Sequence, residues 1–213
     1  MMKVNGNKMI GRLVSIITAS LLVFSTSHAA TIPANITTFN NVVTDATFVV
    51  KSKGWSDPAF GDMGWTHSSD WGAFYAKQNQ NVTIKLVAAD KGIHPGSTVW
   101  FRGANDTAPD NYVVDHFYPQ NANFAKFGAT DESTGAALGN IIMTYVTHGY
   151  DQDSNTVKKA YLNPKIDKVA GQLTLNFKAP YTGNYMFVVG GFNPDANIDT
   201  TLQYHIDTKV TVK

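Results

Sequence analysis

Apolar and polar residues alternate along several stretches of the chain. Val82–Leu86 and Leu173–Phe177 place an apolar side chain at every second position, as a strand with one buried face does. Leu202–Val212 shows the same alternation up to the carboxyl terminus. Tyr185–Val189 is apolar throughout, which is typical of a central strand covered on both faces. The pattern therefore predicts at least four strands.

Turn-forming residues separate these strands. Residues 179–184 and 190–195 contain the Gly, Pro, Asn and Asp residues that favour turns. Phe48–Val50 and Thr98–Phe101 are two further short strand candidates. Many short strands with turns between them, and no convincing helical period, predict an all-β fold. We expect an antiparallel β-sandwich resembling a jelly roll.

The middle of the chain has a different composition. Residues 102–165 are polar, rich in Asp, Asn, Gly and Pro, and interrupted by aromatic residues. We expect long polar loops here, and Gly135–Met143 is the one segment compatible with a short helix. Long loops on a rigid sandwich are a common place for binding residues.

The amino terminus reads as a secretory signal. A basic start precedes an apolar run from Leu13 to Phe24, and small residues follow at Ser27 and Ala29. The run is too short for a stable membrane anchor, and no later segment is long and apolar enough to span a bilayer. We expect a signal peptide at 1–29, a single sandwich domain at 30–213, and no membrane span.

Composition limits the partners and ligands of the mature chain. The signal carries three of the 17 basic residues and none of the 16 acidic residues, which leaves 14 against 16, a formal charge of −2. Such a chain argues against nucleic-acid binding, which depends on clustered Lys and Arg. Because cysteine is absent, a metal site would use imidazole, carboxylate or thioether ligands.

Five histidines remain after removal of the signal, and three of them have ordinary explanations. His205 lies on the polar face of its strand, and His94 precedes a proline in a turn. His148 follows the apolar run 141–146 and precedes a glycine, which suggests a loop edge and leaves its role open. A scattered histidine is usually a surface or hydrogen-bonded residue.

His67 and His116 stand out because of their neighbours. His67 lies between Trp65 and Trp71, whereas His116 follows Asp115 and precedes aromatic residues. On a strand, Trp65 and His67 would share one face. Imidazole is a common ligand of copper, zinc, iron and nickel. The alternative is an aromatic core layer in which both histidines form only hydrogen bonds.

The sequence contains few signs of a calcium site or of a catalytic site. Acidic clusters at 106–110, 151–153 and 195–199 suggest calcium, but none has the spacing of an EF-hand loop, so calcium is a minor expectation. The HExxH motif, the glycine-framed serine elbow and the phosphate-binding glycine loop are all missing from the sequence. We therefore expect a protein that is not an enzyme.

Four long segments resemble one family. They are GWTHSSDWGAF, PGSTVWFRGANDTAPDNYVVDHFYPQN, GATDESTGAALGNIIM and APYTGNYMFVVGGFNPDA. The chain resembles the copper-repressible, surface-associated copper-binding proteins of methane-oxidising bacteria, the MopE and CorA type. The likeness extends from about Thr47 to the carboxyl terminus.

The resemblance implies a copper site with two imidazoles and one oxidised tryptophan. In such a site the tryptophan is converted to kynurenine, whose amine nitrogen binds the metal. The histidine positions correspond to His67 and His116, the tryptophan to Trp65 or Trp71, and His148 is a reserve ligand. A few nitrogen donors favour Cu(I), whereas Cu(II) prefers more donors in a tetragonal arrangement.

The sequence leads to one expected function and one alternative. We expect an exported protein, at the cell surface, secreted or periplasmic, that scavenges or buffers copper and hands it to an outer-membrane or periplasmic partner. The alternative is a secreted β-sandwich adhesion or accessory module that binds a glycan or a protein partner. Exposed aromatic residues that stack on sugar rings would be its signature.

Overall fold

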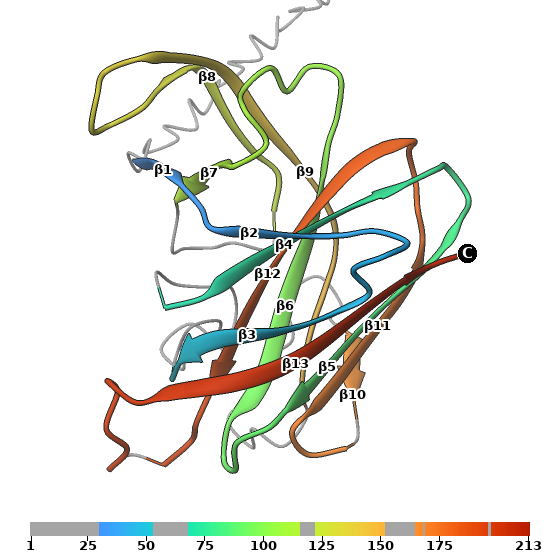
Figure 1. Cartoon of the computed structure of the whole chain (residues 1–213), viewed down its shortest axis with the longest axis vertical. Coiled ribbons are helices and arrows are strands. Elements are labelled where there is room, and N and C mark those ends of the chain that lie inside the picture. The colour runs from blue at the N-terminus through green and yellow to red at the C-terminus, as the bar shows by residue number, and fades with distance from the viewer. Residues whose placement is uncertain (1–29, 53–67, 116–121, 152–164, 168, 196) are drawn as a thin grey trace, which may run out of the picture.

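The computed structural model describes residues 30–52, 68–115, 122–151, 165–167, 169–195 and 197–213 (Figure 1). Within these ranges the chain forms thirteen strands in three sheets and no helix, so no helix here is long and apolar enough to cross a membrane. The strands are β1 (Ala30–Pro33), β2 (Ile36–Phe39), β3 (Asp45–Lys51), β4 (Asp70–Ala76), β5 (Asn81–Ala88), β6 (His94–Arg102), β7 (Tyr112–Asp115), β8 (Phe124–Thr130), β9 (Ala137–Asp151), β10 (Lys165–Asp167), β11 (Gln172–Lys178), β12 (Gly183–Phe192) and β13 (Gln203–Val212).

Two large sheets make up most of the fold. The seven-stranded sheet has the order β10-β9-β6-β12-β4-β2, with β8 paired to β9 as well, and the four-stranded sheet has the order β11-β5-β13-β3. Most neighbours are antiparallel, and the parallel exceptions among the paired strands are β10 with β9 and β2 with β4. The small third sheet pairs β1 with β7.

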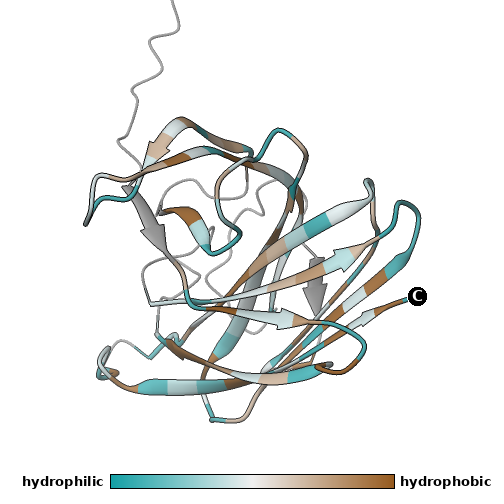
Figure 2. Cartoon of the chain, turned by 45° about the horizontal axis from the view of Figure 1, so that its top comes forward, coloured by the Kyte–Doolittle hydropathy of each residue, from teal (hydrophilic) through white to brown (hydrophobic). Residues whose placement is uncertain are grey.

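The main core lies between the two large sheets. Alternate residues of β5, β11 and β13 face alternate residues of β4, β6 and β12, and Figure 2 shows the resulting stripes of apolar and polar residues along the strands. Phe48, Ile84, Leu173 and Phe187 are among its fully buried members. Sheets packed face to face in this way form a sandwich, which confirms the predicted fold class.

A second core covers the other face of the seven-stranded sheet, which we call the outer face. The β8–β9 hairpin and the β1–β7 pair lie beside one another at one end of the sandwich (Figure 1). The cluster that they help to bury is formed by Trp71, Trp100, Val113, Val114, Ala129, Ile141, Met143, Tyr150, Met186 and Val188. The sheet is therefore buried on both sides over much of its width.

The middle of the chain is more regular than its composition predicts. Strands β7, β8 and the fifteen-residue β9 all fall within residues 102–165. The segment 135–143 contains no helix, because Gly135 lies in a turn with φ 71° and β9 begins two residues later. Ile141 and Met143 then alternate into the outer core, as strand residues do.

Strand β4 was not predicted, and its packing explains why. A Cβ atom at Gly72 would lie 2.3 Å from the ring of Phe187, so only glycine fits beneath that ring. Gly72 weakens the strand pattern in the sequence because glycine is depleted in strands. The close approach is what lets Phe187 fill the main core.

Candidate functional site

Four adjacent strands place one row of side chains across the outer face. Trp71 of β4 pairs with Val188 of β12, Val188 pairs with Thr98 of β6, and Thr98 pairs with His148 of β9. Cross-strand partners point to the same face of a sheet, so the four side chains form one row about 14 Å long. All four are buried. Two of the predicted site residues, Trp71 and His148, therefore share a buried face.

Trp100 occupies the neighbouring row and connects distant parts of the chain. Its ring lies 5.9 Å from the ring of Trp71, with a tilt of 31° between the planes. Its indole Nε1 donates a hydrogen bond of 2.9 Å to the backbone oxygen of Ala122. Phe124 packs against the same ring at 5.9 Å. Trp100 thus joins the start of β4 to the segment that leads into β8.

A β-bulge sets the direction of His148. Val99 pairs with Thr147 and Trp100 pairs with Tyr145, so Val146 is an extra residue in β9 with no partner across the ladder. Residues three apart on a regular strand face opposite sides, but the bulge returns His148 to the side of Tyr145. The Tyr145 hydroxyl lies 2.7 Å from Nδ1 of His148 as a result.

The Tyr145 hydroxyl is a donor at neutral pH, as an ordinary phenol is. Removal from water raises the pKa of Tyr145 from 10.0 to about 12, which extends the pH range over which it stays protonated. When Tyr145 donates, Nδ1 of His148 is the acceptor and the ring proton is on Nε2. His148 is therefore a buried, hydrogen-bonded strand residue, which corrects the prediction that it lies at a loop edge.

Three of the predicted site residues, Trp65, His67 and His116, lie outside the described residues. Of their immediate neighbours, Ser68 and Asp115 are described. Ser68 follows His67 in the sequence, and its backbone oxygen accepts a 3.0 Å hydrogen bond from Lys51. Asp115 precedes His116 and ends β7, where it pairs with Ala30.

A carboxyl group, that of Asp70, lies at the start of β4, three residues after His67 in the sequence. Asp70 Oδ1 accepts a 2.9 Å hydrogen bond from the backbone nitrogen of Trp71. Burial raises the pKa of Asp70, and backbone hydrogen bonds from Trp71 and Val49 partly oppose the shift. A carboxylate in this position favours a nearby cation, because its negative charge is poorly solvated.

A buried ion pair anchors the loop between β6 and β7. The Arg102 guanidinium binds both carboxylate oxygens of Asp106, one of them at 2.8 Å, and Nη1 also donates to the backbone oxygen of Tyr112 at 2.9 Å. Asp106 in turn accepts from the backbone nitrogen of Ile142. Both carboxylate oxygens of Asp106, one member of the acidic cluster at 106–110, are therefore engaged in hydrogen bonds within the protein.

The other two described histidines form carboxylate pairs. His94 Nδ1 lies 2.9 Å from Asp151, whose side chain is fully buried and also accepts from the backbone nitrogen of Gly171. His94 begins β6, so it is a strand residue and not a loop residue as predicted. His205 lies on the exposed side of β13, as predicted, and its Nδ1 is 2.9 Å from Asp90.

The acidic cluster at 195–199 makes turn contacts, whereas residues 152–153 of the cluster at 151–153 lie outside the described residues. Asp195 accepts from the backbone nitrogen of Asn197, and Asp199 accepts from the backbone and hydroxyl of Thr201. In the described part of the chain no group of three or more His, Cys, Asp or Glu residues is placed to hold a metal ion. Calcium binding stays an untested expectation.

Known proteins place the chain in a family. The model of the copper(I)-binding, CorA-like protein family matches residues 27–199, most of the chain. The protein belongs to the CorA-like family. No curated protein matches the sequence.

Two solved structures share the CorA-like fold. One is CorA, a surface-associated copper-binding protein important in copper acquisition by Methylomicrobium album BG8, with a TM-score of 0.74 and 29% identity over 85% of this chain and 100% of that chain. The other is the secreted protein MopE of Methylococcus capsulatus, in which an oxidised tryptophan facilitates copper binding. MopE has a TM-score of 0.55 and 17% identity over 85% of this chain and all of its own, a likeness that concerns the fold alone.

Sequence reasoning missed two side chains of the CorA-like outer face. Trp100 was placed in a predicted strand but given no role, and Tyr145 was not considered. A signal for Trp100 exists in the sequence, because it sits between Val99 and Phe101 in a run that is apolar on both faces. Tyr145 gives no comparable signal, since only the bulge brings it beside His148.

Proposed function

We propose that this CorA-like protein is exported and binds copper to scavenge or buffer it, without turnover chemistry. Copper in this proposal is the cargo, held as Cu(I) by the imidazoles of His67 and His116 and by a kynurenine made from a tryptophan. Membership of the copper(I)-binding CorA-like family supports it, as does the copper-acquisition role described for the relative CorA.

The contacts of Trp100 carry the proposal. Trp71 follows His67 by four residues, and Ala122 follows His116 by six. Trp100 contacts both Trp71 and Ala122. The indole ring of Trp100 therefore contacts the segment that follows His67 and the segment that follows His116, although these two histidines are 49 residues apart in the sequence. Each contact lies within six residues of a proposed ligand. This arrangement favours a shared site for His67 and His116.

Packing favours Trp65 over Trp71 as the oxidised residue. Trp71 is only 5% exposed and stacks on Trp100 in the close-packed outer core. Opening its indole ring to kynurenine would disturb that packing, because core side chains have little room to change shape. We propose Trp65 as the modified ligand and Trp71 as its structural support.

His148 is better suited to support than to ligation. Its Nδ1 is engaged by the Tyr145 hydroxyl, and when that nitrogen accepts, the proton on Nε2 leaves neither ring nitrogen with a lone pair for a metal. It also lies three strands away from Trp71 in the same row. We therefore keep His148 as a reserve ligand and give the two principal positions to His67 and His116.

The chemistry of the surroundings suits reduced copper. Two or three nitrogen donors satisfy Cu(I), which accepts low coordination numbers, whereas Cu(II) is drawn to a fuller tetragonal set. The neighbouring aromatic cluster limits access of water and lowers the local dielectric, which favours the less charged ion. The half-buried carboxyl group of Asp70, three residues after His67 in the sequence, would add negative charge that favours a bound cation.

Export gives such a site access to external copper. The proposed signal at 1–29 would direct residues 30–213 to the periplasm, the cell surface or the medium. A partner in the outer membrane or periplasm would then receive the metal.

Copper content tests the ligand assignment. We expect the purified exported protein to hold one copper ion per chain, and both His67→Ala and His116→Ala to lose most of it, because each removes a principal nitrogen donor. His205→Ala is the matched control, since His205 is an exposed histidine on the other sheet. Copper measured by elemental analysis at unchanged levels in both ligand variants would refute the assignment.

Mass spectrometry tests the identity of the third ligand. We expect peptides of the native protein to carry kynurenine at Trp65 and an intact indole at Trp71. Kynurenine at Trp71 would overturn the choice made from packing. An intact indole at both positions would remove kynurenine from the site while leaving the histidine experiment as a separate test.

A further inference from the structure

A cavity opens on the outer face beside the Trp71 end of the Trp71–His148 row, since Ile36, the cross-strand partner of Trp71, is one of its lining residues. It has a volume of about 480 Å³, which lies within the range of small-ligand sites. Its floor is formed by Ala73 of β4 and by Asn184 and Met186 of β12, and its walls by residues 34–36 and 110–111. We call this cavity the outer-face groove.

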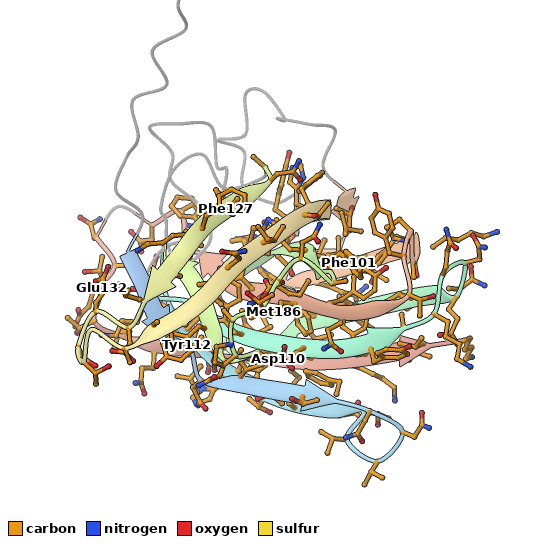
Figure 3. The ribbon with its side chains drawn as sticks, turned by 90° about the horizontal axis from the view of Figure 1, so that it is seen from above. Phe101, Asp110, Tyr112, Phe127, Glu132 and Met186 are labelled. Atoms are coloured by element: carbon orange, nitrogen blue, oxygen red, sulfur yellow. The ribbon has the colours of Figure 1, made fainter. Side chains whose placement is uncertain are left out.

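The walls of the outer-face groove are held firmly. The backbone nitrogen of Ala34 donates a 2.8 Å hydrogen bond to the oxygen of Asn111, which joins the two walls. Arg102 at the floor binds Asp106, and its Nη1 lies 2.9 Å from the oxygen of Tyr112 and 2.8 Å from the Met186 sulfur. Figure 3 shows Asp110, Tyr112 and Met186 grouped between the β8–β9 hairpin and β2. The groove is therefore largely pre-formed.

The groove presents unused hydrogen-bonding groups. Among the described residues, the side chains of Asn35, Asp110, Asn111 and Asn184 have no hydrogen-bond partner, and all four are exposed. Each amide offers two donors and one acceptor, and the carboxylate adds acceptors. Such a set matches a ligand that carries many hydroxyl groups.

Charge excludes two other classes of ligand. The positive charge of Arg102 is neutralised by its bidentate pair with Asp106, so little attraction for an anion remains. Asp110 is the one lining carboxylate, which is too few for a hard cation that requires several oxygen ligands. The groove therefore fits a neutral polar molecule.

A half-exposed aromatic ring stands at the edge of the groove. Tyr75 is 54% exposed and is the cross-strand partner of Asn184. A second cavity of about 280 Å³ shares Tyr75 and Phe39 with the groove. A ring flanked by amides can stack on the apolar face of a sugar while the amides bind its hydroxyls. Two cavities that meet at this ring leave room for more than one sugar unit.

We propose that the outer-face groove binds a neutral oligosaccharide, with Tyr75 as the stacking residue and Asn35, Asn111 and Asn184 as hydroxyl ligands. This function goes beyond copper binding and does not depend on it. It would attach the exported protein to a glycan surface while the copper site stays available.

Side-chain amide signals in NMR spectra of the exported protein test the proposal. Maltohexaose, cellohexaose and chitohexaose would each be added to roughly 10 mM, a concentration that detects even millimolar binding. We expect one of them to shift the amide signals of Asn35, Asn111 and Asn184. Tyr75→Ala and Asn184→Ala should each weaken that binding about tenfold, the typical effect of losing one good contact.

Tyr181→Ala is the matched control, because Tyr181 is 47% exposed but does not line the groove. It should bind the sugar as the unchanged protein does, and all three variants should keep the dispersed amide NMR spectrum of a folded protein, a readout that does not depend on copper. The proposal is wrong if no sugar shifts these amides, if the shifts map elsewhere, or if Tyr75→Ala binds normally. Shifts produced only by a neutral Gly-Ser hexapeptide would overturn it in favour of a peptide groove.

Discussion

The two faces of the seven-stranded sheet are buried for different purposes. The inner face meets the four-stranded sheet through aliphatic and phenylalanine side chains such as Val99, Phe187 and Val189. The outer face carries Trp71, Trp100, Thr98 and His148, which mix aromatic rings with polar groups. The same strands therefore supply packing energy on one side and directed hydrogen bonds on the other. The comparison teaches that burial alone does not separate scaffold from site.

The largest expected effect belongs to the inner face. Phe187→Ala should lower the free energy of unfolding by about 3–5 kcal/mol, because it removes a fully buried ring and leaves a cavity. Phe187→Leu is the milder version if the alanine variant does not fold. Denaturant titration of the exported protein measures the loss.

The copper content of the protein that remains folded should not change in either Phe187 variant. Val49→Ala, which alters a residue exposed on the four-stranded sheet, should have little effect on either property. A marked loss of copper per folded protein in Phe187→Leu, with only a small loss of unfolding free energy, would show that the inner face also supports the copper site and would contradict the comparison.

An intermediate effect is expected from Trp100→Phe on the outer face. The smaller ring still packs but leaves some unfilled volume, and the Nε1 hydrogen bond to the part-buried carbonyl of Ala122 is lost, which by itself costs about 1 kcal/mol. Because Ala122 follows the His116 segment, copper should also be held several-fold less tightly. Competition with a coloured Cu(I) chelator measures this.

Met143→Leu serves as the comparison for Trp100→Phe. Met143 is buried in the same outer cluster, and a swap of similar volume usually costs under about 1.5 kcal/mol. Copper affinity should stay the same in this variant. Equal losses of copper affinity in both variants would mean that general packing, and not the indole hydrogen bond, supports the site.

The smallest expected effect concerns Tyr145 and depends on pH. The pKa of Tyr145 is about 12 in the folded protein, against 10.0 for an unperturbed tyrosine. A group whose pKa is raised by folding contributes stability that is complete below pH 10 and is lost as pH rises toward 12. Tyr145→Phe removes this contribution, and near neutral pH it also loses the bond to His148, worth about 1 kcal/mol.

The unfolding free energies of the wild type and Tyr145→Phe should therefore differ by a constant amount below pH 10 and converge as the pH rises from 10 toward 12. Parallel curves would show that Tyr145 is not buried as a neutral phenol. Tyr181→Phe, which alters a half-exposed tyrosine, should run parallel to the wild type.

Sequence patterns predicted the inner face well and the outer face poorly. Strands β5, β11 and β13 follow from alternation, because each has one more deeply buried face along its length, and β12 follows from its continuous apolar run. Strand β4 was hidden by Gly72, whose role depends on a ring from another strand. Strand β9 was hidden because the extra residue Val146 breaks the period of two.

The candidate site could be approached from sequence only in part. Neighbouring residues drew attention to His67 and His116, but only the family resemblance grouped them with a tryptophan. The row from Trp71 to His148 depends on the register of four strands that are not consecutive in sequence. Register across such distances is a property of the folded sheet, so no local pattern encodes it. The roles of His67, His116 and Trp65 stay predictions.

The unpaired Val146 shifts the alternation of β9 by one residue. Each side chain after it faces the side opposite to the one that a regular strand would give it, so this single residue sets the direction of His148 and Tyr150. Deletion of Val146 would restore the period of two and leave Thr147 inward and His148 outward, because Trp100 and Val99 would then oppose consecutive residues of β9. A regular strand that paired Val146 would instead turn Thr147 outward and His148 toward the aliphatic core.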